Sequence, residues 1–436
     1  MGWELVLGIL FVSLLLLLFI GLPVAFSLGF LSVVAALLLW PSFSGVVGVV
    51  LSGFGNLDNF TLVCVPLFIF MAEIIMLSKL GTDTYEAANK FLKRLHGGLG
   101  IASVVFGTIF GAVCGASTAG TATVGLLSMP EMINRSYKKE FAGAIVAFAG
   151  ALSILIPPSI VLIVYGTLAN KSIGQLFAGG FIPGVIMALL SIIYIFLRGI
   201  IKPQDAPRDT SEVSWKERFK YLRKTWGIIT LAVVLLGSIY TGFATPTEAS
   251  AMGALAALLL TIFKGAFSWK LLRNSLLATV RTTAMIGWII IGATSFGYIV
   301  IYSGAASQLT AWIVSLHMPK MLIVLVIMIG YLVMGMFMDP VSIVMVTVPI
   351  MLPLLHQLHI DILWFGILVT INMCAGNISP PMGLNIYIVK GIRPDTDLYG
   401  LFKEAIPFIV IDFVTILLVM FFPQLATWLP SITIPR

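Results

Sequence analysis

The sequence predicts an all-α polytopic membrane protein built from two inverted-topology repeats, with about ten transmembrane helices and two re-entrant hairpins. Three observations lead to this prediction. Hydrophobic residues make up 59% of the 436 residues and charged residues only 10%, whereas soluble chains carry about 25% charged residues. Apolar runs recur along the whole chain, each long enough to cross ~30 Å of hydrocarbon. The second half also repeats the proline pattern of the first, which is typical of an internal duplication.

The first apolar run, residues 5–21, is predicted to be a transmembrane helix. Glu4 precedes it and no basic cluster does, whereas a secretory signal carries a positive leader and a small-residue cleavage site. The net charge of +7 arises from basic residues that collect in short loops between apolar runs, as in cytoplasmic loops, so it does not indicate nucleic-acid binding. No cofactor is expected, because the three cysteines lie in apolar stretches without metal-like spacing. They are Cys64, Cys114 and Cys374.

A shift of 223 residues overlays the second half of the chain on the first. Four prolines of the first half meet prolines of the second under this single shift, which chance would not produce. We therefore predict a first repeat over 1–213, a second over 224–436, and a cytoplasmic connecting loop over 198–224. The matching pairs are Pro23 and Pro246, Pro130 and Pro353, Pro157 and Pro380, and Pro158 and Pro381.

Each repeat is predicted to contain five spanning helices and one segment that is too long for a single span. The overlong segments, 98–130 and 320–354, are interrupted by small or proline-bearing stretches and are the predicted hairpins. In the first repeat the spans are 5–21, 23–40, 59–79, the broken helix 141–168, and 175–197. In the second they are 225–243, 246–264, 282–301, the broken helix 361–389, and 405–424.

Loop charge predicts how the chain is oriented. Basic residues flank both ends of 98–130, so both ends are expected in the cytoplasm, and the segment enters and returns. The flanks of 320–354 lack such clusters and are expected in the periplasm, as are both termini. Because five spans are an odd number, the two repeats point in opposite directions. The amphipathic segment 80–97 is predicted to lie on the cytoplasmic face, joining a mobile part to a fixed one.

The tips of the two hairpins carry the first candidate site residues. The tip of 98–130 is rich in small residues and offers the hydroxyls of Ser117, Thr118 and Thr121. In 320–354, Asp339 precedes Pro340, which breaks the helix. An acid at membrane depth is costly and is functional by default. The alternative is that Asp339 is only the N-cap of the second half-helix.

The double prolines in the two broken helices carry the second group. Each pair removes two backbone donors and frees carbonyl oxygens, which are tolerated at membrane depth only against protein, water or a cation. The half-helices that follow each break direct N–H groups inward and favour an anion. Simple kinks are the alternative. The predicted cation-binding residues are Gly115, Ser117, Ile154, Pro157, Gly335, Asp339, Asn377, Ile378 and Pro380. The predicted substrate-binding residues are Ser117, Thr118, Thr121, Ser159, Asn377, Met382 and Asn385.

Other residues support weaker interpretations. Glu248 opens a predicted helix and is expected to cap it. Asp412, in the last predicted span, is an acid whose role the sequence leaves open. Five tryptophans near predicted membrane faces are expected to be interfacial anchors. They are Trp3, Trp40, Trp226, Trp364 and Trp428.

Four motifs resemble the large membrane subunit of tripartite ATP-independent periplasmic (TRAP) transporters, the DctM type, over essentially the whole length. The family's second proline motif usually reads closer to Thr-Pro-Pro-Val-Gly, so Ser379 and Met382 are mild departures. The motifs are Gly115-Ala-Ser-Thr-Ala-Gly120, Ile156-Pro-Pro-Ser159, Thr245-Pro-Thr-Glu-Ala249 and Ile378-Ser-Pro-Pro-Met-Gly-Leu-Asn385.

The resemblance implies a protein of the bacterial inner membrane with an ion-transporter fold, in which an elevator-type transport domain moves against a scaffold. It also implies sodium as the coupling ion. Two partners are implied, a small four-helix membrane subunit of the DctQ type and a periplasmic substrate-binding protein of the DctP type. The implied substrate is a small organic anion: a C4-dicarboxylate, sialic acid or another sugar acid.

We therefore expect sodium-driven uptake of a small organic carboxylate. The nearest alternative is a symporter of the same superfamily that needs no binding protein. A gated channel is a further alternative, since re-entrant hairpins also occur there. A membrane-embedded enzyme is disfavoured, because no Walker, HExxH or GxSxG motif occurs and the four histidines lie near predicted helix ends.

Overall fold

The computed structural model of the chain is all-helical, which confirms the predicted all-α polytopic membrane fold. It describes residues 2–40, 43–209, 211 and 213–433. The outermost residues of the two predicted repeats, 1 and 434–436, lie outside the described part, as do 41–42 and residues 210 and 212 of the connecting loop. In the described part, six helices are long and apolar enough to span a membrane, and seven more are apolar but shorter, with 10–17 residues.

The described residues of the first half form ten α-helices and two 3₁₀ turns. These are α1 (Trp3–Phe19), α2 (Val24–Leu39), α3 (Ser44–Leu57), η1 (Phe60–Val63), α4 (Cys64–Leu77), α5 (Lys79–Leu92), α6 (Gly98–Cys114), α7 (Ser117–Asn134), α8 (Lys139–Ala151), η2 (Leu152–Ile154), α9 (Ile160–Ala169) and α10 (Ile173–Ile201).

As far as residue 433, where the described part ends, the second half forms eleven α-helices. These are α11 (Trp215–Lys224), α12 (Trp226–Tyr240), α13 (Pro246–Phe263), α14 (Trp269–Tyr302), α15 (Ala305–Ser315), α16 (Lys320–Gly335), α17 (Pro340–Gln357), α18 (Ile362–Ile378), α19 (Leu384–Ile392), α20 (Leu398–Phe421) and α21 (Gln424–Thr433).

Several helices of the two halves begin 223 residues apart, the shift that relates the prolines. Helix α7 begins at Ser117 and α17 at Pro340, and both have 18 residues. Helix α8 begins at Lys139 and α18 at Ile362. The halves differ where α3 and α4 are separate helices, whereas the corresponding stretch of the second half is the single 34-residue α14.

Five helices and one side chain differ from the sequence-based expectation. Helices α3, α15 and α21 were not expected, α14 begins 13 residues before the predicted span 282–301, and the connecting loop contains α11. The expectation that Trp364 anchors at a membrane face is wrong. Its side chain is 5% exposed, and its indole N–H donates to the Val419 carbonyl oxygen at 2.8 Å. Buried indole groups need such a partner.

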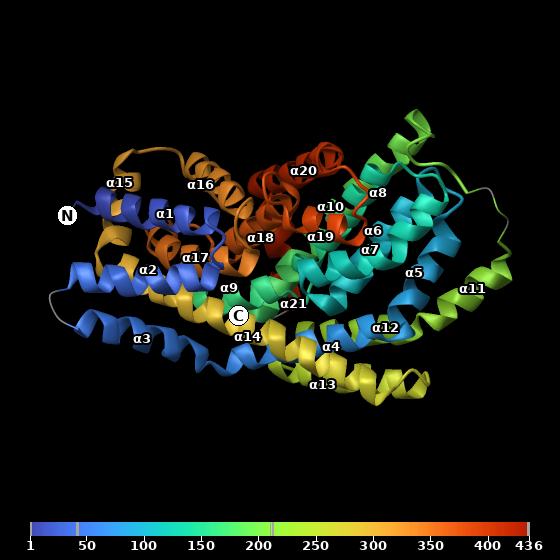
Figure 1. Cartoon of the computed structure of the whole chain (residues 1–436), viewed down its shortest axis with the longest axis horizontal. Helices are drawn as coiled ribbons and strands as arrows, with labels where there is room; N and C mark the ends of the chain where they lie inside the picture. The colour runs from blue at the N-terminus through green and yellow to red at the C-terminus, as the bar shows by residue number, and fades with distance from the viewer. Residues whose placement is uncertain (1, 41–42, 210, 212, 434–436) are drawn as a thin grey trace.

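The helices form a long body in which α14, with α4, α12 and α13, runs along one side (Figure 1). Helices α6, α7 and α8 lie toward one end and α15, α16 and α17 toward the other, with α9, α18 and α19 between them (Figure 1). Each hairpin's second helix packs on the short half-helix of the other half: α7 on α19 and α17 on α9. The two helix breaks therefore lie in the middle of the molecule.

Ion pairs attach the chain between α10 and α11 to the rest of the molecule. Asp209 has a side chain only 5% exposed and pairs with Lys93 at 3.5 Å and Arg135 at 2.7 Å. Asp205 pairs with Arg198, which also contacts Glu404. The next helix, α11, is held on α5 by the pair Lys90–Glu217 at 2.8 Å. The segment that joins the two halves is thus fixed on both sides.

Candidate functional site

The tip of the first hairpin contacts the first broken helix. Helices α6 and α7 meet at Gly115, whose φ of +68° suits glycine. A Cβ here would lie 2.5 Å from the carbonyl oxygen of Pro158, so only glycine allows this approach. The Gly115 carbonyl accepts the backbone N–H of Ile160 at 3.2 Å. The tip and the proline pair therefore form one contact, as two of the predicted motifs require.

The first break lies between α8 and α9 and is completely buried from residue 151 to 160. The Pro157–Pro158 peptide bond is cis. Ser159 caps α9: its hydroxyl accepts the Leu162 N–H at 3.2 Å and donates to the Ile154 carbonyl. The Ile154 carbonyl, which was predicted to hold a cation, thus has a side-chain donor as one partner.

Two buried hydroxyls near this break have no hydrogen-bond partner among the described residues. They are Thr121 Oγ1 on α7 and Ser153 Oγ in η2. Close glycine contacts bring them together: a Cβ on Gly150 would meet Thr121 Oγ1 at 1.9 Å, and one on Gly120 would meet Ser153 Oγ at 2.5 Å. Unpaired buried oxygens are unusual and call for an explanation such as an ion or water. Ser153 was missed in the sequence, although it lies in the predicted broken helix.

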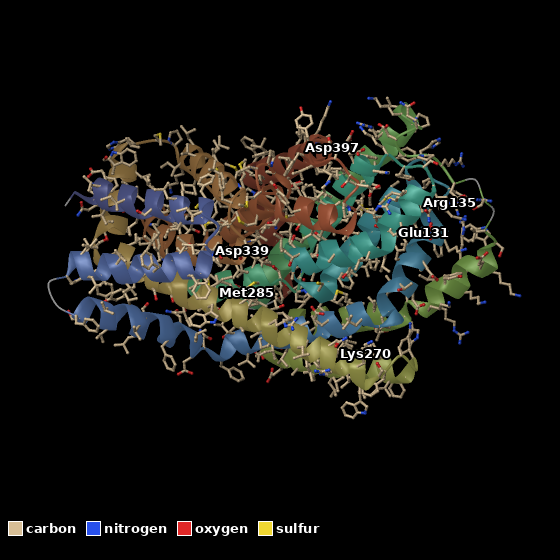
Figure 2. The ribbon with its side chains drawn as sticks, in the orientation of Figure 1. Glu131, Arg135, Lys270, Met285, Asp339 and Asp397 are labelled. Carbon is tan, nitrogen blue, oxygen red and sulfur yellow. The ribbon has the colours of Figure 1, made fainter. Side chains whose placement is uncertain are left out.

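The second hairpin breaks between α16 and α17, as predicted. At this break Gly335 lies against Gly376 of α18, and a Cβ on Gly376 would come within 2.7 Å of the Gly335 Cα. Asp339 accepts the N–H groups of Val341 and Ser342, both at 3.1 Å, and the Ser342 hydroxyl. This is N-cap geometry, the alternative that the sequence left open. The half-buried Asp339 lies near the middle of the molecule (Figure 2).

The second break, between α18 and α19, differs from the first in exposure. Its cis peptide bond joins Pro380 and Pro381, and both prolines and Met382 are exposed. Asn377, in the last turn of α18, is 2% exposed, and its Nδ2 has no hydrogen-bond partner among the described residues. This break thus places a buried unpaired amide beside an accessible proline turn.

Ser117 and Asn385 join the two halves of the chain at the centre. The Asn385 amide donates to the Ser117 hydroxyl at 2.8 Å and to the Ala147 carbonyl at 3.0 Å. Both side chains are buried, whereas Thr118, the next residue of α7, is exposed. These residues begin α7 and α19, and neither helix has a side-chain cap. Uncapped helix N-termini present free N–H groups and a partial positive charge, which suit an anion.

Glu73 is a further acid in the membrane-spanning part that the sequence analysis missed. It lies in the middle of α4, half-buried, and interacts electrostatically with Cys114 at the tip of the first hairpin. The available signal was the presence of one acid inside an otherwise apolar run. Glu248, in contrast, forms a capping box with Thr245 at the start of α13, in agreement with the structural interpretation of this residue.

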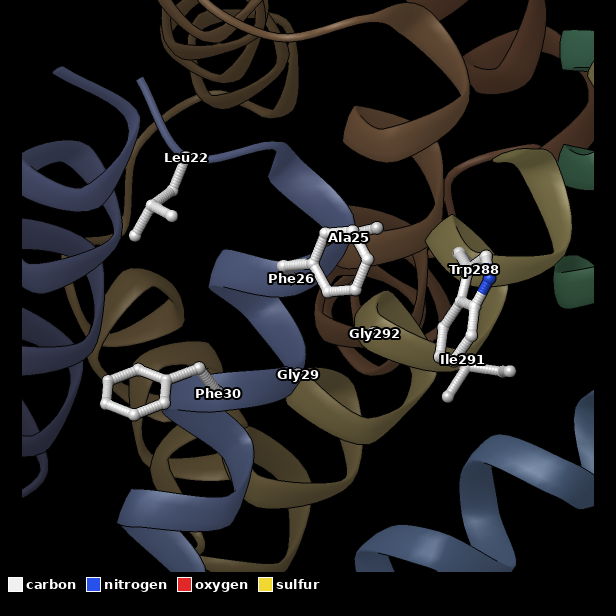
Figure 3. A pocket seen from close by; sticks show the side chains of 8 residues that line it. All are labelled: Leu22, Ala25, Phe26, Gly29, Phe30, Trp288, Ile291 and Gly292. Atoms are coloured by element: carbon white, nitrogen blue, oxygen red, sulfur yellow. The ribbon is translucent and has the colours of Figure 1, made fainter. Parts of the chain in front are cut away.

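An apolar pocket lies among exposed side chains of the first and second halves of the chain. It has a volume of about 400 Å³ and lies between α2 and α14, with Phe26, Phe30 and Trp288 around it (Figure 3). A second pocket of about 480 Å³ is more polar and is lined by residues that include Asn59, Lys171 and Thr245. The apolar pocket does not offer the polar groups that an organic anion needs.

An all-helical polytopic fold with paired helix breaks is typical of secondary transporters. A profile of the family described as "Tripartite ATP-independent periplasmic transporter, DctM component" matches residues 11–425. The chain belongs to this family. It is therefore an integral, multi-pass membrane protein of a bacterial transporter, and specifically a TRAP large permease.

Relatives span the same length. The C4-dicarboxylate TRAP transporter large permease protein DctM of Vibrio cholerae is 31% identical, over 98% of this chain and 97% of its own. The sialic acid TRAP transporter large permease protein SiaM of the same organism is 30% identical over 95% and 96%. The ectoine/5-hydroxyectoine permease UehC of Ruegeria pomeroyi is 27% identical over 98% and 99%.

Solved structures support the fold at low sequence identity. The YdaH transporter of Alcanivorax borkumensis superimposes with a TM-score of 0.60 at 15% identity, over 91% of this chain and 95% of its own. MtrF of Neisseria gonorrhoeae gives a TM-score of 0.55 at 13% identity, over 86% and 84%. These similarities concern the architecture of the helices only.

Proposed function

We propose that the chain is the large permease of a sodium-coupled TRAP transporter that takes up a small organic carboxylate by an elevator motion. The observation that carries this proposal is the Ser117–Asn385 contact, which places two uncapped helix N-termini side by side. An anion's carboxylate would accept N–H groups from both helices. The relatives named for C4-dicarboxylates, sialic acid and ectoine indicate small polar organic compounds.

The accessible side of this site would belong to the second break. Met382 and Thr118 are exposed, whereas Ser117, Asn377 and Asn385 are buried behind them. A substrate entering here would meet its polar partners only after leaving water, which strengthens each hydrogen bond. Ser159, in the buried first break, would contribute through the start of α9.

Sodium would be held by oxygen atoms at the two breaks. The unpaired hydroxyls of Thr121 and Ser153 are hard donors at the first break, next to the tip that carries Gly115 and Ser117. Carbonyl oxygens near Ile378 and Gly335 are the corresponding donors at the second. Binding a cation there would partner oxygens that otherwise stay unpaired in a buried environment.

The transport domain would contain both hairpins, both broken helices, α10 and α20, and the scaffold would contain α2, α4, α13 and α14. The packing of α7 on α19 and of α17 on α9 supports this division, because it ties the four site-bearing segments into one body. Helices α6–α7 and α16–α17 would be re-entrant from opposite faces, with both termini of the chain in the periplasm.

Two partners belong to this proposal. A small membrane subunit of the DctQ type would insert into the apolar groove of Phe26, Phe30 and Trp288. A periplasmic protein of the DctP type would deliver substrate near the polar pocket that contains Asn59 and Lys171. Omitting the periplasmic protein from a reconstituted uptake assay tests whether it is needed.

The cation site is tested by uptake of radiolabelled carboxylates into proteoliposomes under a sodium gradient. Thr121→Ala combined with Ser153→Ala removes the two unpaired hydroxyls of the proposed cation site and should abolish sodium-dependent uptake. Ser315→Ala, which removes an exposed hydroxyl bonded within its own helix, serves as the control. Unchanged sodium dependence in the double variant would falsify the assignment of the cation site.

A further inference from the structure

Asp412 is an acid in the interior of α20 that the proposed transport site does not use. Its side chain is 0% exposed. Both carboxyl oxygens are buried and have no hydrogen-bond partner among the described residues. Buried carboxyl groups in proteins are normally paired or hydrogen-bonded, because an isolated buried charge is very unfavourable. The group therefore needs a partner that the described side chains and backbone do not supply.

The helices that pack against α20 place one titratable group, the Cys374 thiol, near Asp412. Helix α20 packs against α8, α10, α18, α19 and α21. On α18 the Cys374 thiol is near enough to interact electrostatically with Asp412, and its hydrogen is directed to the carbonyls of Ala151 and Thr370. Helix α21, over its described residues, carries no titratable side chain.

The other titratable groups on these helices contact only the N-terminal half of α20. Tyr194 and Arg198 of α10 meet Phe408 and Glu404. The remaining titratable groups contact the first turns of α20 or the residues just before it. Lys139 of α8 pairs with Asp395, Glu140 adjoins Gly400, Tyr387 of α19 packs on Phe402, and Lys390 bonds the carbonyls of Pro394 and Thr396.

A ring cluster separates Asp412 from the ionic groups below it. Phe408 lies one turn away on the same face and stacks on Phe148 at 4.9 Å between ring centroids. One turn closer to the N-terminus of α20, Glu404 forms an ion pair with Lys138 at 2.7 Å. With a rise of about 1.5 Å per residue, Asp412 is about 12 Å farther along the helix than Glu404. The rings of Phe148 and Phe408 therefore lie between the Asp412 carboxyl and the cations Lys138 and Arg198.

A proton suits this environment better than a metal cation. Hard metal cations in proteins take about six oxygen ligands, whereas the group facing the carboxyl here is a thiol that is already hydrogen-bonded elsewhere. A proton needs one oxygen and removes the charge. We propose that Asp412 is a proton-binding site, occupied in this conformation, that makes transport respond to pH separately from the sodium site.

Exchange of the Asp412 proton with water depends on how α20 packs against its neighbours. A local opening of the packing of α20 on α8 and α18, inside the transport domain, lets water reach the carboxyl group. The O–H bond then breaks, the electron pair stays on the carboxylate oxygen, and the proton passes to water; uptake reverses these steps. Water would enter from the end of α20 where Glu404 meets Lys138 and Arg198, once the Phe148 and Phe408 rings separate. The transport consequence rests on the proposed function, whereas the proton site does not.

Infrared spectroscopy of the purified chain in lipid bilayers tests the site itself. The carbonyl band of a neutral carboxylic acid should be present at about pH 7 and should lose one residue's intensity in Asp412→Asn. Asp397→Asn, the same change at the exposed end of α20 (Figure 2), should leave the band intact. An unaltered band in Asp412→Asn overturns the proposal. Should that variant not fold, Asp412→Glu must shift the band, and an unmoved band overturns the proposal equally.

Uptake under a fixed sodium gradient tests the consequence. Between about pH 6 and about pH 8 the wild-type rate should change at least about threefold, and the rate of Asp412→Asn should stay nearly constant. Equal pH profiles in the two proteins overturn the coupling to transport. Loss of the band in Asp412→Asn with no sodium-driven uptake in either protein supports the proton site and contradicts the proposed function instead.

Discussion

The Cys374 thiol donates to the carbonyl oxygen of Ala151 at 3.3 Å, and these two residues are 223 positions apart. The same shift relates the two proline pairs and the first residues of α7 and α17. Equivalent positions of two related halves meet only near the axis that relates them. The contact therefore joins two positions that the 223-residue shift equates, and Asn377 lies three residues from it along the chain.

The contact between the second hairpin and α18 depends on two glycines. Gly376→Ala places a methyl group 2.7 Å from the Gly335 Cα, and because the obstacle is backbone, the helices must separate. We expect a loss of about 1–3 kcal/mol in the free energy of unfolding, as for other overpacked cores. Thermal unfolding of the purified chain measures it. Gly330→Ala, in the same hairpin with nothing within 4 Å, is the matched control and should be at least as stable as the wild type.

The Ser117–Asn385 pair should be energetically coupled. Each single alanine variant removes the hydrogen bond between the two side chains, and Asn385→Ala also frees the Ala147 carbonyl. We expect about 0.5–1.5 kcal/mol for Ser117→Ala, more for Asn385→Ala, and less than the sum for both together. Strict additivity would contradict the contact. Ser128→Ala on α7, whose hydroxyl bonds within its own helix, is the control.

The connecting segment should detach at low pH. Burial of Asp209 opposes its ionisation, but hydrogen bonds from Ser211 and the charges of Lys93 and Arg135 outweigh it and lower the pKa of Asp209. The folded pKa lies below the unfolded value of about 3.9, so the stabilisation is complete above about pH 4 and is lost as the pH falls through the folded pKa. Limited proteolysis of residues 202–213 across this range is the measurement.

Asp209→Asn should loosen the same segment at neutral pH, because it leaves the largely buried Lys93 without its carboxylate. We expect about 1–3 kcal/mol of destabilisation and faster cleavage between α10 and α11. Asp395→Asn, which alters an exposed pair with Lys139, should change neither quantity appreciably. If both variants are cleaved at the wild-type rate, Asp209 does not hold the segment.

The capping box of α13 should affect stability without affecting transport. Thr245→Ala removes the side-chain partner of the Glu248 N–H and should cost about 1 kcal/mol. Sodium-driven uptake per folded molecule should stay at the wild-type level. A large loss of uptake at unchanged stability would show that this motif acts in transport.

Sequence reasoning located the helix breaks closely because proline and glycine determine them locally. Helix α17 begins at Pro340 and α9 follows Pro158, and in both cases the missing N–H and the ring fix the boundary. Helix α3 was missed because four glycines, which weaken helix propensity, lie among its 14 residues. The early start of α14 was missed because Lys270, Arg273 and Arg281 interrupt its hydropathy.

The contacts within the candidate site could be predicted from the sequence less well than the fold. Whether Asp339 caps a helix or binds a cation depends on where its oxygens point, and the cap became visible only with the backbone of α17. Ser117, Asn377 and Asn385 were all expected at the site, but the sequence could not show that Ser117 forms its hydrogen bond with Asn385, 268 residues away. Such pairings are set by tertiary packing, which neither spacing nor composition encodes.

The two proline turns differ in how freely they can change over evolutionary time. In residues 151–160 every side chain is enclosed, so a new residue must fit a filled space. At Pro380, Pro381 and Met382 the surroundings are open, and a side chain there can change size without displacing a neighbour. The enclosed turn is therefore expected to tolerate few substitutions, whereas the open turn can accept side chains of different size without a change elsewhere in the packing.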